Sequence, residues 1–197
     1  EELDLVARFV ERFDAYAVCD EVYEHIVFAG SAHLPFIARP GMAKRALKIG
    51  SAGKMFSLTG WKVGFACATP KLTDAFAKAH QFLTFTTPPN LQSAVAYGLG
   101  KPSELFDEMR NKLSRARDRL TSALKQEGFL VLPATGTYFC GVDLRASGVD
   151  MEDTAFAVRA AKECGVATIP YSAFYVRPPE TSLVRLQRGL KSEILFF

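Results

Sequence analysis

The chain has 197 residues, 49% of them hydrophobic and 23% charged, with a formal net charge of +3. Its length allows a sizeable core in one or two domains, and its composition is ordinary for a globular protein. Basic and acidic residues are interleaved, which argues against nucleic acid as a partner. No apolar run approaches the roughly 20 residues that span a bilayer, and the start lacks the pattern of a signal peptide. We therefore expect neither a nucleic-acid nor a membrane partner.

Cysteine and histidine spacing argues against a metal site. No pair of cysteines has the C-x-x-C spacing, and the histidines have no metal-ligand spacing. These residues are Cys19, Cys67, Cys140 and Cys164, and His25, His33 and His80. Widely spaced cysteines among apolar or small residues predict buried free thiols, a reducing compartment and a cytoplasmic protein.

Hydrophobic spacing predicts helices that alternate with short strands, which is typical of an α/β or α+β fold. The expected helices lie near residues 3–13, 69–83, 90–99, 103–126 and 151–164. The expected strands lie near residues 15–19, 46–49, 63–68, 129–132, 138–144, 166–169 and 182–186, the first of them buried. The sequence lacks an initiator methionine and opens directly into a helical pattern. This pattern suggests an excerpt from a longer polypeptide.

Two helix ends carry clear signals. Thr69 followed by Pro70 predicts a helix start, with threonine as the N-cap and proline at the first helical position. Gly128 predicts the end of the long helix. Because that helix is long and amphipathic, we expect it to bridge two domains.

Lys54 is the residue most indicative of chemistry. It lies in a loop rich in Gly, Ser and Thr, directly after the expected strand at 46–49. Such a site can desolvate an amine and hold it near a cofactor carbonyl, which a Schiff-base lysine requires. A solvated surface lysine is the alternative.

Asp20 and Tyr23 follow another expected strand. Ligands of open α/β sheets gather at strand carboxyl ends, where a carboxylate could keep a pyridine nitrogen protonated. Asp20 could equally be a capping or turn residue. The phenol of Tyr23 could donate a hydrogen bond to a ring oxygen, or its ring could simply pack. Together with Lys54, these residues suggest pyridoxal 5'-phosphate (PLP) chemistry.

Three further residues could bind anions. Ser51 and Lys62 flank Lys54 and bring a hydroxyl and a positive charge, both common in phosphate sites. Their alternatives are a loop cap and a solvated side chain. Arg185 lies in an apolar strand context, which implies a carboxylate partner, either from a substrate or from a structural Asp or Glu.

The order and wording of these segments resemble the class I/II aminotransferases of PLP fold type I. The branch they resemble most is the one that contains kynurenine and methionine aminotransferases. The segments are Asp-Glu-Val-Tyr at 20–23, Ser-x-x-Lys at 51–54, Thr-Gly-Trp-Lys-Val-Gly at 59–64 and Val-Arg-Leu at 184–186. The stretches 84–92, 136–139 and 165–170 agree, so the resemblance covers nearly the whole chain.

The resemblance implies an α/β fold of PLP-transferase fold type I. Residues 1–110 would be the second half of the large, mostly parallel-sheet domain, and residues 111–197 a small C-terminal α+β domain. It also implies a homodimer. Relatives carry a glycine-rich phosphate loop, a stacking aromatic and an asparagine before the Asp-x-x-Tyr segment, and this sequence contains none of them there. We therefore expect the 197 residues alone to have little activity.

The resemblance also implies roles at the cofactor ring. Lys54 would form the Schiff base with PLP, and would then carry the proton between the substrate Cα and the cofactor. Asp20 would pair with the pyridine nitrogen, and Tyr23 with the ring hydroxyl oxygen.

At the two anionic groups, Ser51 and Lys62 would contact the cofactor phosphate, and Arg185 would bind the substrate α-carboxylate. The implied reaction moves an amino group from an amino acid to a 2-oxo acid. A carbon–sulfur β-lyase shares these motifs. A PLP-sensing domain of a transcription regulator and a non-binding fragment are further alternatives.

Substrate hints and departures from the family pattern concern the active-site mouth. No arginine occurs between positions 45 and 110, and Phe82 and Phe85 indicate an apolar site, which favours aromatic, sulfur-containing or broad substrates. Lys62 stands where relatives often have arginine, and Gly53 where many have Ser or Thr. Tyr171 replaces an expected glycine and could reshape the mouth.

Overall fold

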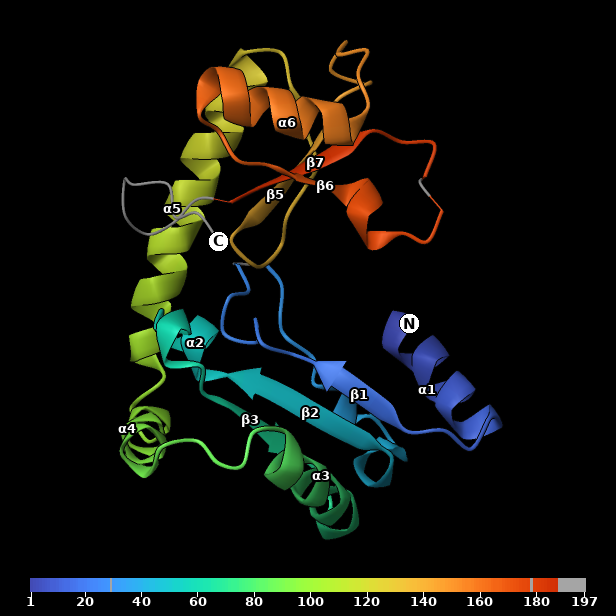
Figure 1. Cartoon of the computed structure of the whole chain (residues 1–197), viewed down its shortest axis with the longest axis vertical. Helices are drawn as coiled ribbons and strands as arrows, with labels where there is room; N and C mark the ends of the chain where they lie inside the picture. Colours follow the sequence, from blue (N-terminus) through green and yellow to red (C-terminus); the bar gives the residue numbers. More distant parts are fainter. Residues whose placement is uncertain (29, 178, 188–197) are drawn as a thin grey trace. The chain divides into compact units, whose positions relative to one another are not determined.

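The computed structural model describes residues 1–28, 30–177 and 179–187. The last ten residues of the expected C-terminal domain lie outside this range. The chain divides into two compact units, the first made of residues 1–27 and 32–106 and the second of residues 28–31 and 107 onward (Figure 1). Among the described residues, no helix is long and apolar enough to cross a membrane.

The first unit is built on a three-stranded sheet in the order β1-β2-β3 (Figure 1). Its strands are β1 (Ala17–Asp20), β2 (Ala46–Ser51) and β3 (Gly64–Cys67). β1 pairs in parallel with β2, from Ala17 opposite Ala46 to Asp20 opposite Ile49. β3 pairs antiparallel with β2 and places Gly64 opposite Ser51. The carboxyl ends of β1 and β2 therefore lie side by side.

Helices and 3-10 turns complete the first unit. They are α1 (Glu2–Arg12), η1 (Phe36–Ala38), η2 (Met42–Lys44), α2 (Ala52–Met55), η3 (Thr59–Trp61), α3 (Pro70–Leu83) and α4 (Pro89–Leu99). α3 begins at Pro70 after the N-cap Thr69, as predicted, although the Thr69 hydroxyl makes no capping hydrogen bond. Among the described residues, the core of the first unit includes a cluster of Val10, Phe36, Met42 and Ala46 and another of Ala52, Val63 and Val95.

The prediction of a buried strand at 15–19 was wrong in one respect. The strand exists as β1, but its side chains alternate between two faces. Ala17 and Cys19 are half-buried and pack against the cluster formed with α1 and η1. Val18 is 70% exposed, and Asp20 lies on the same open face. Local hydrophobicity did not distinguish these faces, because burial depends on which elements cover them.

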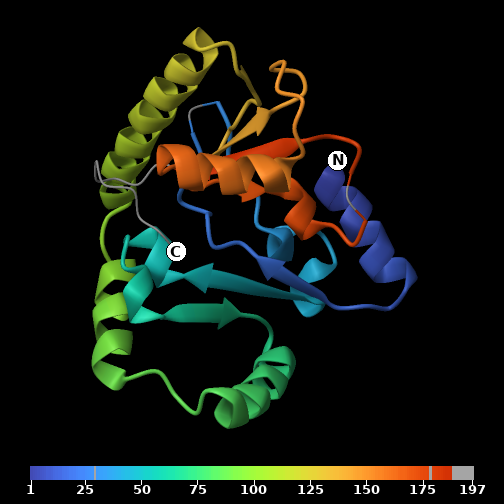
Figure 2. The same cartoon turned by 45° about the horizontal axis from the view of Figure 1, so that its top comes forward.

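The second unit is built on a four-stranded antiparallel sheet in the order β4-β5-β7-β6. Its strands are β4 (Leu130–Val131), β5 (Phe139–Asp143), β6 (Ile169–Pro170) and β7 (Leu183–Gln187), and its helices are α5 (Glu104–Gln126), largely in this unit, α6 (Asp153–Cys164) and η4 (Tyr171–Phe174). Figure 2 shows α6 lying along the sheet. Side chains of α5 and α6, including Leu120 and Phe156, pack on one face.

That face forms the core of the second unit. Cys140, Val142 and Leu144 are all buried at alternate positions, and Val142 pairs with the buried Val184 of β7. Because strand side chains alternate, Arg185 projects from the opposite face, where its partner on β5 is Gly141. The sheet thus has a buried hydrophobic cluster on one face and Arg185 on the other.

A glycine with positive φ terminates each of the helices α5 and α6. Gly128, at φ +86°, ends α5 as predicted, and the Phe129 amide donates to the Leu124 carbonyl at 3.0 Å. Gly165, at φ +66°, ends α6, and the Val166 amide returns to the Ala160 carbonyl at 3.1 Å. The strand expected at 166–169 is therefore displaced to Ile169–Pro170, because the preceding residues turn the chain out of the helix.

Candidate active site

The parallel pairing of β1 and β2 brings two predicted site residues to one face of the sheet. Asp20 is opposite Ile49, and Ser51 lies two residues beyond Ile49 on the same strand. Side chains two residues apart on a strand share a face, so Asp20 and Ser51 face the same side. The Glu21 amide donates to the Ile49 carbonyl at 3.0 Å and holds the strand ends together.

Lys54 stands one turn beyond the end of β2. Ser51 is the N-cap of α2, and its Oγ accepts a hydrogen bond from the Lys54 amide at 3.4 Å. The Lys54 side chain is half-buried, and its Nζ lies 6.0 Å from the centroid of the Tyr23 ring. The amine is thus placed beside the phenol, as the hypothesis of a cofactor site requires.

Lys62 is the C-cap of η3 and lies two residues before the start of β3. The Ala52 amide donates to the Val63 carbonyl at 3.1 Å, which joins the start of α2 to the residue after Lys62. Lys62 itself is exposed and has φ +54°, an uncommon conformation for a residue with a Cβ. Lys62 is thus exposed to solvent two residues before Gly64, which pairs with Ser51 in the sheet.

Gly53 fits a close backbone approach. A Cβ at this position would lie 3.0 Å from the Thr59 Cα and 3.4 Å from the Ser51 Oγ. Both distances are short of, or at the edge of, ordinary van der Waals contact. The close contact between α2 and η3 thus leaves little room for the Ser or Thr side chain that many relatives have at position 53.

The Cys19 thiol adjoins Asp20 in the chain but is not suited to be a nucleophile. Burial, with a smaller contribution from the negative charge of Glu21, raises the pKa of this thiol above its ordinary value. Because the thiolate is the reactive form, Cys19 stays protonated at neutral pH.

Arg185 belongs to the second unit and lies between two aromatic rings. Its guanidinium carbon is 4.0 Å from the centroid of Phe139 and 5.0 Å from that of Phe174. Its Nε is buried and has no hydrogen-bond partner among the described residues. Within that part of the chain, no ion pair joins Arg185 to a carboxylate. The structural Asp or Glu that the sequence left open as a partner is therefore not found among the described residues.

Tyr171 contributes to the same face of the second sheet. A Cβ on Gly141, which pairs with Arg185, would lie 3.3 Å from the Tyr171 Oη. The phenol therefore occupies space that glycine leaves open beside the arginine. Tyr171 also packs edge-on against Phe174, with ring centroids 6.4 Å apart.

The structure thus groups Asp20, Tyr23, Ser51, Lys54 and Lys62 at one end of the first sheet. Arg185 lies in the second unit, on the face opposite its core.

Sequence reasoning missed the two aromatic rings that hold the arginine. Phe139 lies in the stretch 136–139 that resembles the family, but the sequence pattern assigns it no role, and Phe174 lies in no predicted segment. An arginine in an apolar strand without a nearby acidic residue is the signal that could have suggested aromatic neighbours.

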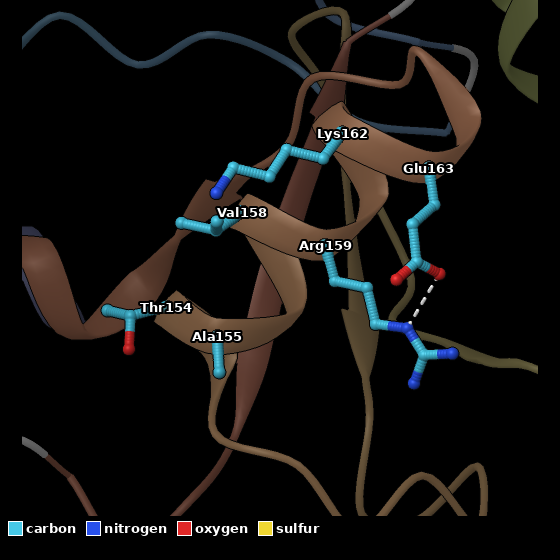
Figure 3. A pocket seen from close by; sticks show the side chains of 6 residues that line it. All are labelled: Thr154, Ala155, Val158, Arg159, Lys162 and Glu163. Carbon is cyan, nitrogen blue, oxygen red and sulfur yellow. Dashed lines mark hydrogen bonds and ion pairs between the residues drawn. The ribbon is translucent and has the colours of Figure 1, made fainter.

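An open hollow runs along the exposed side of α6 (Figure 3). It is lined by Thr154, Ala155, Val158, Arg159, Lys162 and Glu163. Arg159 and Glu163 are paired with each other at 2.9 Å. One helix supplies the whole lining, and no predicted site residue is among them, so this hollow is not part of the candidate site.

Comparison with known proteins identifies the class. The model of the family "Aminotransferase class I and II" matches residues 1–194. The chain therefore belongs to this family, whose members use PLP. The resemblance stated from the sequence is confirmed.

Curated relatives place the chain more closely. It is 40% identical to a probable N-succinyldiaminopimelate aminotransferase, DapC, of Mycobacterium tuberculosis, over 88% of this chain and 43% of that protein. It is 36% identical to the methionine aminotransferase of Escherichia coli, over 92% of this chain and 47% of that protein. It is also 36% identical to a kynurenine–oxoglutarate transaminase of Dictyostelium discoideum, over 89% and 45%. The chain thus spans about half the length of these relatives.

Solved structures confirm the fold. The M. tuberculosis N-succinyldiaminopimelate aminotransferase superposes with a TM-score of 0.87 at 38% identity, over 94% of this chain and 48% of that one. The structure of E. coli YbdL, for which a methionine aminotransferase function was identified, has a TM-score of 0.86 at 34% identity, over 94% of this chain and 48% of that one. The chain therefore has the fold of the PLP-dependent aminotransferases, fold type I.

The residues at the first sheet fit PLP chemically. Lys54 offers an amine for the aldehyde, Ser51 and Lys62 offer a hydroxyl donor and a cation for the phosphate, and Asp20 offers a carboxylate for the pyridinium. The Tyr23 phenol lies beside the amine. Each polar group of the cofactor thus has a complementary side chain at this strand end.

Proposed function

We propose that this chain forms part of a PLP-dependent transaminase that moves an amino group from an amino acid to a 2-oxo acid. One observation carries the proposal: the half-buried Lys54 amine lies 6.0 Å from the Tyr23 ring centroid, at the strand ends where Asp20 and Ser51 share a face. When bound, PLP supplies an electron sink for the negative charge that develops at the substrate Cα.

The proposed roles follow from the chemistry of each side chain. The Lys54 Nζ would accept the proton from the substrate Cα as general base and pass it to the cofactor, and in the second half-reaction it would carry a proton in the opposite direction. The Asp20 carboxylate holds a proton on the cofactor nitrogen, and the Tyr23 phenol donates to the ring oxygen. Ser51 and Lys62 bind the phosphate, the former by a hydroxyl and the latter by charge.

Arg185 would bind the substrate α-carboxylate. A guanidinium accommodates a carboxylate with two parallel hydrogen bonds, which fixes the orientation of the Cα–H bond. The rings of Phe139 and Phe174 support this role, because they hold the guanidinium without neutralising it.

The substrate proposal rests on apolar surroundings. Aromatic groups contact Arg185, and the relatives named above act on substrates as different as methionine, kynurenine and N-succinyldiaminopimelate. We propose aromatic, sulfur-containing or broad amino-acid specificity. A carbon–sulfur β-lyase reaction on the same site is the second candidate. Cystathionine separates the two, because a lyase releases pyruvate whereas a transaminase yields the corresponding oxo acid.

We also propose that the full-length protein is a cytoplasmic homodimer. The prediction of buried thiols was wrong for Cys67 and Cys164, which are exposed, so the proposal of a reducing compartment rests on the wide spacing of the cysteines in the sequence. Phe82, Leu83 and Phe85 are 87%, 82% and 76% exposed, an apolar patch of the kind that subunit interfaces cover. Light scattering on the purified full-length protein tests the stoichiometry.

The central test is chemical trapping on Lys54. The full-length protein that carries this sequence is incubated with PLP, reduced with borohydride and mapped by peptide mass spectrometry. We expect the pyridoxyl label on Lys54, and loss of both the label and the visible absorbance in Lys54→Ala. Lys71→Ala, which alters an exposed lysine of α3, is the matched control and should label normally. A label elsewhere, or none, contradicts the proposal.

A further inference from the structure

Two acidic residues of the turn after β1 face away from the proposed cofactor site and into the body of the first unit. Glu21 directly follows Asp20, and Glu24 directly follows Tyr23. Both lie in a segment closed by two backbone hydrogen bonds, from the Glu24 amide to the Glu21 carbonyl at 3.1 Å and from the Ile26 amide to the Tyr23 carbonyl at 2.8 Å. Asp20 and Tyr23, two of the five proposed cofactor-binding residues, thus each have an acidic neighbour immediately after them.

Glu21 joins this turn to the connection that leads to η1. Its Oε2 lies 2.9 Å from the His33 Nε2, and its Oε1 accepts from the Phe36 amide at 2.9 Å. The Glu21 side chain is only 9% exposed, and Phe36 is part of the first unit's core. Both carboxylate oxygens are therefore engaged by groups that are themselves anchored.

Glu24 joins the same turn to the neighbouring strand. Its carboxylate pairs with the Lys48 ammonium, and the two side chains are 13% and 15% exposed. Lys48 pairs with Cys19 in the sheet and so lies on the face opposite Asp20. The Glu24–Lys48 pair therefore contacts the turn on the side of the sheet opposite Asp20 and the proposed cofactor site.

These pairs differ from the surface ion pairs of the chain. Exposed pairs contribute little, because water and salt screen them. A pair shielded from water is more rigid, and removing one partner leaves a poorly solvated charge. Asp14 and Arg45 offer a contrast at the amino-terminal end of the same two strands: they lie 2.7 Å apart, with Asp14 87% exposed.

We propose that Glu21 and Glu24 are positioning residues, which hold Asp20 and Tyr23 in the orientation that PLP needs. The inference rests on the proposed function. Neighbouring side chains at a strand end point to opposite sides, so the contacts of Glu21 fix the direction of Asp20. Tyr23 and Glu24 lie in the turn itself, where the pair of Glu24 with Lys48 restrains the backbone that carries Tyr23. Backbone hydrogen bonds alone close the turn, whereas the two carboxylates attach it to η1 and β2.

The test compares Glu21→Gln, Glu21→Ala and Glu24→Gln with Asp14→Asn as the matched control, all in the full-length protein. Amide hydrogen exchange without PLP is the first measurement. We expect the amides of Glu24 and Ile26 to exchange several-fold faster in the Glu21 and Glu24 variants than in the control. Glu21→Gln keeps an oxygen acceptor for the Phe36 amide and should show the smaller effect.

PLP binding is the second measurement. We expect the Kd for PLP to rise about tenfold in Glu24→Gln and Glu21→Ala, which corresponds to about 1.4 kcal/mol. The pH midpoint of the visible band of bound PLP should also shift, because Asp20 and Tyr23 tune it. A purely structural role would lower the melting temperature and leave that midpoint unchanged in the protein that remains folded.

Two failures are distinguishable. If the unaltered protein labels at Lys54 but the variants keep the Kd, the pH midpoint and the exchange rates of the control, the positioning role is wrong and the proposed function stands. If the unaltered protein does not label at Lys54, the proposed function fails, and the role of Glu21 and Glu24 toward PLP fails with it.

Discussion

Replacement of Asp153 should loosen the support of the proposed carboxylate-binding site. Asp153 is the first residue of α6 and is 3% exposed. Its Oδ2 accepts from the Ser172 amide and its Oδ1 from the Ser172 Oγ, both at 2.8 Å. Ser172 lies in η4 together with Phe174, whose ring packs on the Arg185 guanidinium. One buried carboxylate thus joins the start of α6 to the segment beside the arginine.

The magnitude follows from these contacts. Asp153→Ala removes two hydrogen bonds to a charged acceptor, each worth about 1.5–3 kcal/mol, and leaves the Ser172 donors unsatisfied. Loss of a negative charge from a helix N-terminus adds at most about 1 kcal/mol. Together these contributions predict a fall of about 3–7 kcal/mol in the free energy of unfolding. Asp153→Asn retains one oxygen acceptor, so about half of this loss is expected.

The assay is urea unfolding of the full-length protein followed by circular dichroism, together with hydrogen exchange of the α6 amides. Glu152→Ala is the matched control: the neighbouring carboxylate pairs with Arg145 at 2.6 Å but is 68% exposed, so its loss should cost less than about 1 kcal/mol. If Asp153→Ala proved no more destabilising than Glu152→Ala, the reasoning from buried hydrogen bonds would be refuted.

Two further predictions concern the second unit. Burial raises the pKa of the Cys140 thiol above its ordinary value of 9.0, so its contribution to stability is present below pH 9.0 and is lost as pH rises through the higher folded value. The decline in unfolding free energy above pH 9.0, measured by urea titration, should therefore be smaller in Cys140→Ala; an unchanged slope would contradict this. Arg185→Lys should raise the KM for the amino acid about tenfold or more with a smaller change in kcat, because lysine lacks the two-pronged donor geometry. Steady-state kinetics check this, and an unaltered KM would exclude Arg185 as the carboxylate-binding residue.

Much of the fold could be predicted because its signals are local. Amphipathic spacing placed the helices near residues 103–126 and 151–164 within a few residues of α5 and α6. Turn and cap residues such as Gly128 placed the ends of elements, since a glycine with positive φ acts through its own backbone. The displaced strand at Ile169–Pro170 shows the limit: helix exit at Gly165 competed with an apolar run that looked like a strand.

The site residues were predicted by type and order, but not by their partners. The spacing of Asp20, Tyr23 and Lys54 indicated PLP chemistry because each residue type matches one group of the cofactor. The partners of Arg185 could not be predicted in this way. An acidic partner was as plausible as a substrate, and the aromatic rings became apparent only when β7 was paired with β5.

The sequence by itself determined the family, the positions of most elements and the chemical identity of the candidate site. Only the tertiary structure decided that Asp20 shares a face with Ser51, and that Glu21 and Glu24 anchor the turn from the opposite side. The physical reason is strand register. It pairs residues 29 positions apart, from Ala17 with Ala46 to Asp20 with Ile49, and a shift of one residue would reverse every side chain to the other face.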